Sequence, residues 1–193
     1  MTGSGSAIED EVPAGRADAP EPDVRLVEGT ADIDDPDAFL GDLRRIGEET
    51  GTVVQAFDAD LIVSATQLRE AARLAARALA RDEAVARDPA VEILLYTAGR
   101  RQIDRALELG VSAGPTRIVV AVADLDPAGA SPVDLDEAVD AVGELLEPTE
   151  TLGSVDERAV REYYDVTDRE LAATDGDLAA VVRERVALLD VEK

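Results

Sequence analysis

Cysteine and histidine are both absent from the 193 residues of this sequence. Without cysteine there is no disulfide framework and no thiolate metal site. Without histidine the chain lacks the most common general base and the most common metal ligand, so Ser–His and Cys–His catalytic pairs are excluded. Neither GxGxxG nor a GxxxxGKS-type phosphate loop occurs. We therefore predict no catalytic residue, no cofactor, no metal and no enzymatic activity; a purely carboxylate mechanism is the one chemistry that the composition leaves open.

Long apolar runs and aromatic side chains are also scarce. Tryptophan is absent, and the chain has two phenylalanines and three tyrosines. No run of about 18 apolar residues occurs, so the sequence predicts no membrane span. The first residues lack the basic and apolar regions of a secretory signal. We expect a cytoplasmic protein with no membrane partner and no DNA partner.

Positive charge is scarce compared with negative charge. The chain has 43 acidic and 19 basic residues and a net charge of -24, and its one lysine is Lys193. Abundant acids with almost no lysine resemble the protein composition of extreme halophiles, in which molar salt shortens the screening length to about 3 Å. We expect a halophilic, archaeal protein, with an ordinary acidic protein as the alternative. The acidic cluster Asp32, Asp34, Asp35 and Asp37 fits a solvated surface near a helix start better than a site for a hard cation.

Apolar periodicity divides the chain into a tail and one domain. Residues 1–22 are rich in glycine, proline, alanine and acids, which predicts a disordered acidic tail. Residues 23–193 alternate between helical and extended patterns. The expected fold class is α/β (α+β), a small central β-sheet flanked by several helices in a single domain.

Several elements have clear local signals. Helices are expected from Pro36 to Gly51, from a cap at Ser64 or Thr66, from the cap Asp88 to Gly99, and from about Arg100 to Leu109. Strands are expected over 24–29, 52–59 and 116–125, the last buried on both faces. Further helices are expected from about 133, after a capping box at Thr167 and Glu170, and at the end of the chain.

Arginines gather in the middle of the chain. The window 61–110 holds eight arginines and seven acids, a net charge of +1, whereas the rest of the chain has a net charge of −25. A segment that departs so far from the acidic composition is expected to contact an anion or a partner protein. Arg69, Arg73, Arg77 and Arg81 recur every four residues, so they share one face of the helix that follows Ser64.

Arg100 and Arg101 are expected in the first turn of a helix, where each exposed cation opposes the helix dipole at a cost of about 0.3–1 kcal/mol. A phosphate held by both side chains and by the free backbone N–H groups would offset that cost. Alternatively, the pair is a basic surface that bonds to nearby acids such as Asp104. The spacing alone favours neither reading.

A longer stretch has a recognisable pattern. The segments QAFDADLIVSATQLREAARLA and EILLYTAGRRQIDRALELGV, with the ending ERVALLDVEK, resemble the PRPK-binding protein (TPRKB) family, the small accessory subunit of the KEOPS complex. The resemblance covers about residues 24–193 and is loose over 124–177. The pattern residues are Glu92, Ile93, Leu94, Tyr96, Ala98, Gly99, Arg101, Gln102, Ile103, Ala106 and Leu107.

The resemblance implies a function. KEOPS installs threonylcarbamoyladenosine in tRNA, and this subunit is non-catalytic: it binds the small lobe of the kinase-like ATPase subunit and, in archaeal members, the 3′ CCA tail of tRNA. The alternative is a pure protein-interaction adaptor without RNA contact. The kinase-contacting residues stay unassigned. The tRNA-binding candidates are Arg77, Arg87, Tyr96, Arg100, Arg101 and Gln102. Arg101 and Gln102 match the family pattern, Arg100 occupies a variable position, and Tyr96 either stacks on a base or belongs to the core.

Overall fold

The computed structural model describes residues 21–125 and 132–191, with backbone only for Asp190 and Val191. The tail predicted over residues 1–22 lies outside the described residues except for residues 21 and 22. The described elements, in chain order, are β1 (Val24–Ile33), α1 (Pro36–Thr50), β2 (Val53–Asp58), a 3₁₀ turn (Ala59–Leu61), α2 (Ala65–Ala80), α3 (Pro89–Ala98), α4 (Ile103–Leu107), β3 (Gly114–Ala123), α5 (Leu135–Gly143), β4 (Glu147–Pro148), α6 (Glu157–Tyr163), α7 (Asp168–Ala173) and α8 (Leu178–Val191).

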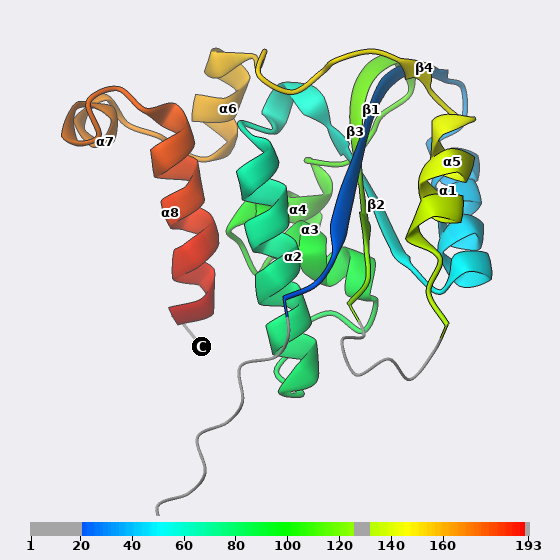
Figure 1. Ribbon diagram of the computed structural model, residues 1–193. Coiled ribbons are helices and arrows are strands. Elements are labelled where there is room, and N and C mark those ends of the chain that lie inside the picture. Colours follow the sequence, from blue (N-terminus) through cyan, green and yellow to red (C-terminus); the bar gives the residue numbers. More distant parts are fainter. Residues whose placement is uncertain (1–20, 126–131, 192–193) are drawn as a thin grey trace, which may run out of the picture.

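The strands form one antiparallel sheet in the order β2-β3-β1-β4 (Figure 1). Strand β3 is in the middle, where Ala121 faces Leu26 of β1 on one side and Gln55 of β2 on the other. Six consecutive residues, 118–123, are fully buried, as the continuous apolar run predicted. The predicted mixed fold, a small sheet covered by helices in one domain, is confirmed.

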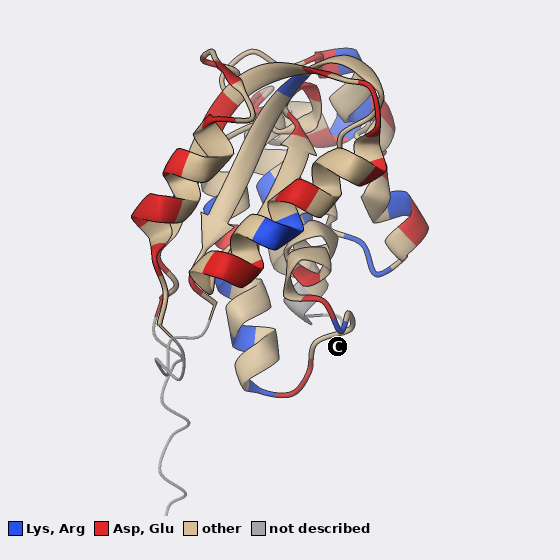
Figure 2. Cartoon of the chain, turned by 90° about the vertical axis from the view of Figure 1, so that its right-hand side faces the viewer, with Lys and Arg blue, Asp and Glu red and all other residues tan. Residues whose placement is uncertain are grey.

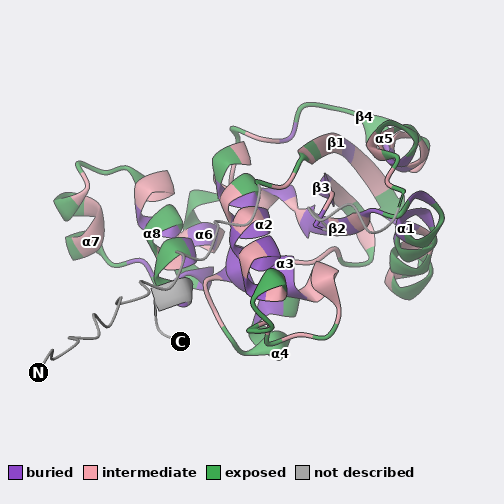
Figure 3. Ribbon diagram, turned by 60° about the horizontal axis from the view of Figure 1, so that its bottom comes forward, coloured by how far each residue is buried: buried purple, intermediate pink, exposed green. Residues whose placement is uncertain are grey.

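Helices cover both faces of the sheet. Because successive side chains point to opposite faces of a strand, Val120 and Val122 share a buried cluster with residues of α1 and α5, whereas Val119 and Ala121 share one with residues of α2, α3 and α8. Figure 3 shows the buried residues concentrated where α2 and α3 meet the sheet. Small residues on α2 allow close packing there; the buried alanines of this helix are Ala71, Ala72, Ala75, Ala76 and Ala78.

Capping signals in the sequence set most helix ends as expected. In α1, Asp35 accepts the N–H groups of Asp37 and Ala38 at 3.0 and 3.2 Å, and Gly51 ends the helix with a φ of 70°. Ser64, and not Thr66, caps α2. The capping box between Thr167 and Glu170 is also confirmed at the start of α7.

The helix predicted from Arg100 to Leu109 is much shorter in the structure. α4 contains only Ile103–Leu107, so Arg100 and Arg101 precede it instead of occupying its first turn. The Arg100 N–H bonds to Leu95 O at 3.2 Å and thereby completes the end of α3. The prediction that these arginines oppose a helix dipole is therefore wrong. The chain is extended at Gln102, so neither arginine is inside α4.

Two side chains anchor the segment that follows β4 to the sheet. The Glu28 carboxylate of β1 accepts the N–H groups of Thr151 and Leu152, both at 2.7 Å. Burial would raise the pKa of Glu28, but the N–H groups of Leu152 and Thr151 outweigh it and hold the pKa below its usual value. Arg117 of β3 donates to Thr151 O at 2.7 Å and pairs with Asp60. This segment is therefore held against β1 and β3 before α6 begins.

A buried polar network joins α2, α3 and the end of α6. The Gln67 amide donates to Thr97 O at 3.1 Å and to Tyr164 Oη at 2.7 Å, and its oxygen accepts the Val63 N–H at 3.0 Å. Tyr164 in turn donates to Thr97 O at 3.1 Å. Since Gln67 is completely buried, none of these groups can exchange its partner for water without local opening.

We expect Gln67→Leu to lower the free energy of unfolding by about 1–3 kcal/mol, because it leaves the Val63 N–H without its acceptor inside the core. Urea unfolding in molar KCl measures the difference. Gln55→Leu is the matched control, since that amide makes one bond, to Ala56 O, and is only partly buried. Equal losses for the two variants would contradict a special contribution of the network.

Candidate nucleic-acid interface

The predicted site centres on the corner between α3 and α4, and Glu92 fixes one side of it. Its carboxylate is 1% exposed and accepts the N–H groups of Val85 and Ala86 at 3.0 and 2.8 Å. These bonds hold the loop between α2 and α3 against α3. The glutamate at the start of the recognised pattern is therefore a structural residue.

Gly99 makes the corner possible. Its φ of 59° is in the left-handed region, and a Cβ added there would lie 2.9 Å from Cβ of Arg185 on α8. Both the backbone conformation and the approach of α8 therefore favour glycine. The sequence signal for a helix end at Gly99 was correct, but it gave no indication that α8 packs on the same residue.

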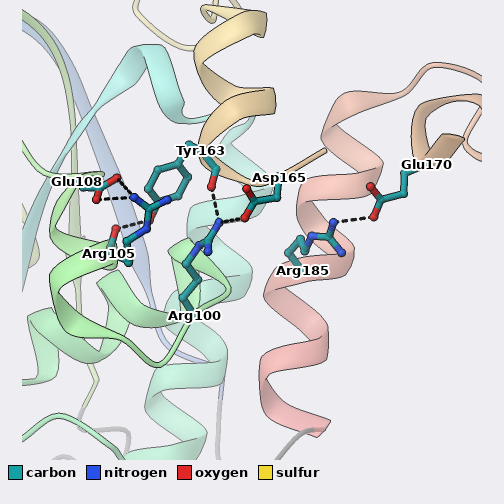
Figure 4. Close-up of polar contacts among 7 residues, drawn as sticks. All are labelled: Arg100, Arg105, Glu108, Tyr163, Asp165, Glu170 and Arg185. Carbon is teal, nitrogen blue, oxygen red and sulfur yellow. Dashed lines mark hydrogen bonds and ion pairs between the residues drawn. The ribbon is translucent and has the colours of Figure 1, made fainter. Parts of the chain in front are cut away.

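Arg100 points inward, toward the chain that follows α6. Its Nη2 donates to Tyr163 O and pairs with Asp165 Oδ2 at 2.8 Å, and its guanidinium lies 5.4 Å from the Tyr163 ring centre (Figure 4). The side chain is 21% exposed. The pairing with an acid that the sequence left open is thus present, but the acid is Asp165 and not Asp104. An anion at Arg100 would have to compete with this carboxylate.

Tyr163, which contacts Arg100, is itself held in place by a hydrogen bond to the chain of α4. Its hydroxyl donates to Arg105 O at 2.8 Å, and burial raises the pKa of this hydroxyl although the Arg100 charge opposes the shift. Sequence analysis missed both Tyr163 and Asp165. They lie more than 60 residues from Arg100, and nothing in their local pattern indicates the contact.

Arg101 and Gln102 are on the surface. The Arg101 side chain reaches Leu189 O in the last turn of α8 at 3.4 Å, where a cation is favourable near the carbonyl end of a helix. Gln102 is exposed at the N-cap of α4 and makes no side-chain capping bond. These two residues, which match the recognised pattern directly, present hydrogen-bond donors to solvent.

Tyr96 lies beneath the corner and is 1% exposed. Together with Arg100 and Arg101 it lines a hollow of only about 10 Å³, which is too small for a nucleobase. The structure therefore has Tyr96 as a core residue, the second of the two roles that the sequence left open. Because the ring is covered, base stacking on Tyr96 would require the corner to open.

Arg77 and Arg87 lie on the elements that precede the corner. Arg77 is in the last turn of α2 and is partly buried, and Arg87 is exposed in the loop between α2 and α3. Of the expected arginine face on α2, Arg69 and Arg81 are exposed, whereas Arg73 pairs with Glu70 at 2.5 Å. In Figure 2, which looks onto α1 and α5, most of the coloured positions on these two helices are acidic.

Within residues 21–125 and 132–191, no group of three or more Asp or Glu side chains is arranged to hold a metal ion. Asp35, a member of the acidic cluster near α1, serves as a helix cap. No helix in this part of the chain is long and apolar enough to cross a membrane.

We expect Arg100→Gln to destabilise the fold by about 0.5–1.5 kcal/mol, because the carbonyl of Tyr163 and the ring beneath the guanidinium lose their cation. Asp165→Asn should cost less, since Asp165 is 73% exposed and its ion pair is screened by solvent. Thermal unfolding of both variants and of the double variant measures this order. A neutral Arg100→Gln would show that Arg100 does not hold the segment after α6.

Comparison with protein families identifies a match. The family model described as kinase binding protein CGI-121 matches residues 42–190, from the middle of α1 to the last turn of α8. A comparison with curated proteins returned no match. The family match contains the whole corner and confirms the resemblance to the KEOPS accessory subunit found in the sequence. The chain belongs to the kinase binding protein CGI-121 family.

Proposed function

We propose that the protein is a non-catalytic subunit of a KEOPS-type complex for tRNA threonylcarbamoyladenosine modification. In this role it binds the kinase-like ATPase subunit and the 3′ CCA tail of tRNA. The observation that carries the proposal is the family match over residues 42–190, which includes the exposed Arg101 and Gln102.

The kinase-like partner is the part that the family description supports most directly. The sequence is consistent with a binding role, since it lacks the side chains for His- or Cys-dependent catalysis. In a cytoplasmic complex the subunit would act by holding its partners together. This role requires no catalytic activity of the subunit itself.

For the tRNA tail, the corner supplies hydrogen-bond donors. Arg101 offers a planar guanidinium that can bind a phosphate through two bonds, and Gln102 offers an amide that can donate to a base or a sugar. Arg87 and the α2 arginines can add contacts to the tRNA backbone. Arg100 and Tyr96 would contribute indirectly, because they hold the corner that positions Arg101.

A pure adaptor without RNA contact is the second candidate, and two observations favour it. Arg100 is occupied by Asp165 and Tyr163, and Tyr96 is buried, so the corner offers no aromatic face for stacking. The net charge of -24 also repels tRNA at low salt. The RNA-binding function therefore depends on Arg101 and Gln102 and on salt high enough to screen the acids.

We expect the chain to form a stable one-to-one complex with the kinase-like ATPase subunit in molar KCl. Size-exclusion chromatography with light scattering gives the mass of the complex. A protein kinase of another family, mixed at the same concentration, is the control and should elute separately. Separate elution of the KEOPS kinase-like subunit as well would remove the basis of the proposed function.

We expect the double variant Arg101→Glu with Gln102→Ala to bind intact tRNA about tenfold more weakly in molar KCl, the effect of losing one or two charge-assisted hydrogen bonds. The measurement compares intact tRNA with tRNA trimmed of its CCA end. Arg44→Glu is the matched control: it makes the same charge change on α1, where the side chain is 71% exposed.

When the CCA end of the tRNA is trimmed, the parent chain and the double variant should bind with the same affinity. An equal loss for Arg44→Glu would mean that only net charge matters. No binding by the parent, or equal binding of intact and trimmed tRNA, would favour the adaptor.

A further inference from the structure

The first half of β1 forms a sheet edge that the proposed function does not use. In the described part of the chain, β4 is the strand beside β1 on the side opposite to β3, and it pairs with Gly29 and Thr30 alone. The residues 24–28, which precede this pairing, are all exposed or partly exposed. The strand at the other end of the sheet, β2, differs in this respect, since its residues Ala56 and Phe57 have no exposed surface.

The backbone groups of Val24 and Leu26 point away from the sheet. The Asp124 N–H bonds to Asp23 O at 3.0 Å, so the backbone of Asp23 faces β3. Successive residues of an antiparallel strand alternate between its two sides. The backbone of Arg25 therefore also faces β3, whereas Val24 and Leu26 direct their N–H and C=O groups outward. No strand within the described residues lies on that side of them.

A hollow of about 390 Å³ crosses this edge from one face of the sheet to the other. α2 and α5 cover opposite faces of the sheet, yet Ala65 of α2 and Val139 of α5 both line the hollow, together with Val24 and Leu26. Figure 1 shows β1 between α2 on one side and α5 on the other. A hollow that touches both helices must pass β1 at its edge, so there is space beside the outward backbone groups.

The charged residues of this part of β1 already have partners. Charged side chains and prolines often block a sheet edge, but β1 contains no proline. The Nε and Nη2 atoms of Arg25 donate to the Asp23 carboxylate at 3.2 and 3.1 Å. Glu28 accepts the N–H groups of Thr151 and Leu152. Neither charge needs a further partner at the edge.

Each face of the sheet contributes to the hollow one charged residue that forms no salt bridge in the described part of the chain. Arg69 is exposed on α2, and Asp136 is exposed on α5. The β1 cation on the α5 side, Arg25, is bonded to Asp23. Because successive side chains of a strand point to opposite faces, an added strand that matches these charges has an acid toward α2 and a base toward α5.

The tail that precedes β1 does not match this pattern. Acids occupy its successive positions 9, 10 and 11, so this part of the tail would present an acid to Asp136 as well as to Arg69. The part of the tail closest to β1 contains Pro13, Gly15 and Pro20, and both residue types are depleted in strands. An added strand from the same chain is therefore unfavourable.

A second copy of the chain does not match it either. Two copies that pair antiparallel through β1 are related by a two-fold axis perpendicular to the sheet, which brings α5 beside α5. The exposed acids of this helix, Asp136, Glu137 and Asp140, would then lie near their counterparts. The charges thus favour a segment of another protein.

We propose that β1 binds an extended segment of a partner protein as an added strand at this edge. The segment bonds to the backbone of Val24 and Leu26. It presents an acid to Arg69 and a base to Asp136. Sites of this kind obtain affinity from main-chain bonds and specificity from alternate side chains. Five extended residues span about 17 Å, the length of the open stretch 24–28. Arg69 alone among these residues is also a candidate for tRNA contact, so the proposal goes beyond the proposed function.

The test uses the full chain in molar KCl and the peptide acetyl-Glu-Lys-Val-Lys-Glu-amide. When this peptide is extended, its glutamates point to one face and its lysines to the other. NMR shift titration gives the Kd. With saturating peptide, hydrogen exchange of the Val24 and Leu26 amides should slow about tenfold. The amides of Arg25 and Val27 face β3, so their exchange should not change.

Two changes to the peptide separate backbone recognition from charge recognition. N-methylation of two consecutive amides removes one N–H that points toward β1 in any orientation of the peptide, and should weaken binding about tenfold. A peptide with lysine in place of both glutamates, or with glutamate in place of both lysines, loses one exposed ion pair and should bind about threefold more weakly.

Charge reversal in the protein should reverse the preference among these peptides. Arg69→Glu should bind the peptide with four lysines most tightly, and Asp136→Arg should bind the peptide with four glutamates most tightly. Arg81→Glu at the end of α2 and Asp140→Arg on α5 are the matched controls. They make the same changes in net charge at exposed residues outside the lining of the hollow, and should keep the preference for the mixed peptide.

Several results would overturn the proposal. These are an absence of peptide binding, an unchanged exchange rate at Val24 and Leu26 with saturating peptide, and a change of preference in the two control variants as well. Protection of Val24 and Leu26 without peptide would also overturn it. Protection that disappears when residues 1–20 are removed would assign the edge to the tail, and protection that depends on concentration would assign it to a second copy.

Discussion

The burial of β3 on both of its faces is the constraint on which the rest of the structure depends. An apolar run from Ile118 to Ala123 cannot face water on either side, so helices must cover both faces of the sheet. The short sheet offers little width, and α1 and α5 fill one face while α2 and α3 fill the other. The corner belongs to the second of these layers, since Tyr96 and Ala98 lie in the same buried cluster as α2 and α8. Its position therefore follows from the packing of the core.

Local chemistry explains which parts of the fold could be predicted from the sequence. α1 begins after Asp35 and ends at Gly51, and α3 begins after Asp88 and ends at Gly99. These ends could be predicted because a helix end is decided by residues within one turn of it. The same reasoning failed after Gly99. There the chain direction is determined by α8 against Gly99 and by the bonds of Arg100 to distant residues, so α4 begins later than its sequence suggests. The order of the strands likewise depends on contacts between segments far apart in the chain.

In the candidate site as well, some features could be predicted from the sequence and others depend on residues far away in the chain. The exposure of Arg101 and Gln102 agrees with their expected place on a surface, and the family pattern identified both. Arg100 looks equivalent to Arg101 in the sequence but differs in the structure, because Asp165 and the Tyr163 carbonyl lie on only one side of the corner. Tyr96 differs for another reason: the position is on α3, where seven consecutive residues from Glu92 to Ala98 are buried. Residue type alone does not distinguish these environments.

The contact of the corner with α8 has a consequence for the newly made chain. Gly99 packs against Arg185, and Arg101 bonds to Leu189, so residues near position 100 adopt their final arrangement only after residues almost 90 positions later have left the ribosome. Sheet strands β1, β2 and β3 can meet earlier, since all of them lie before residue 124. A nascent chain would thus have a formed sheet before it has a formed corner. Its surface at Arg101 would be completed in one of the last folding steps.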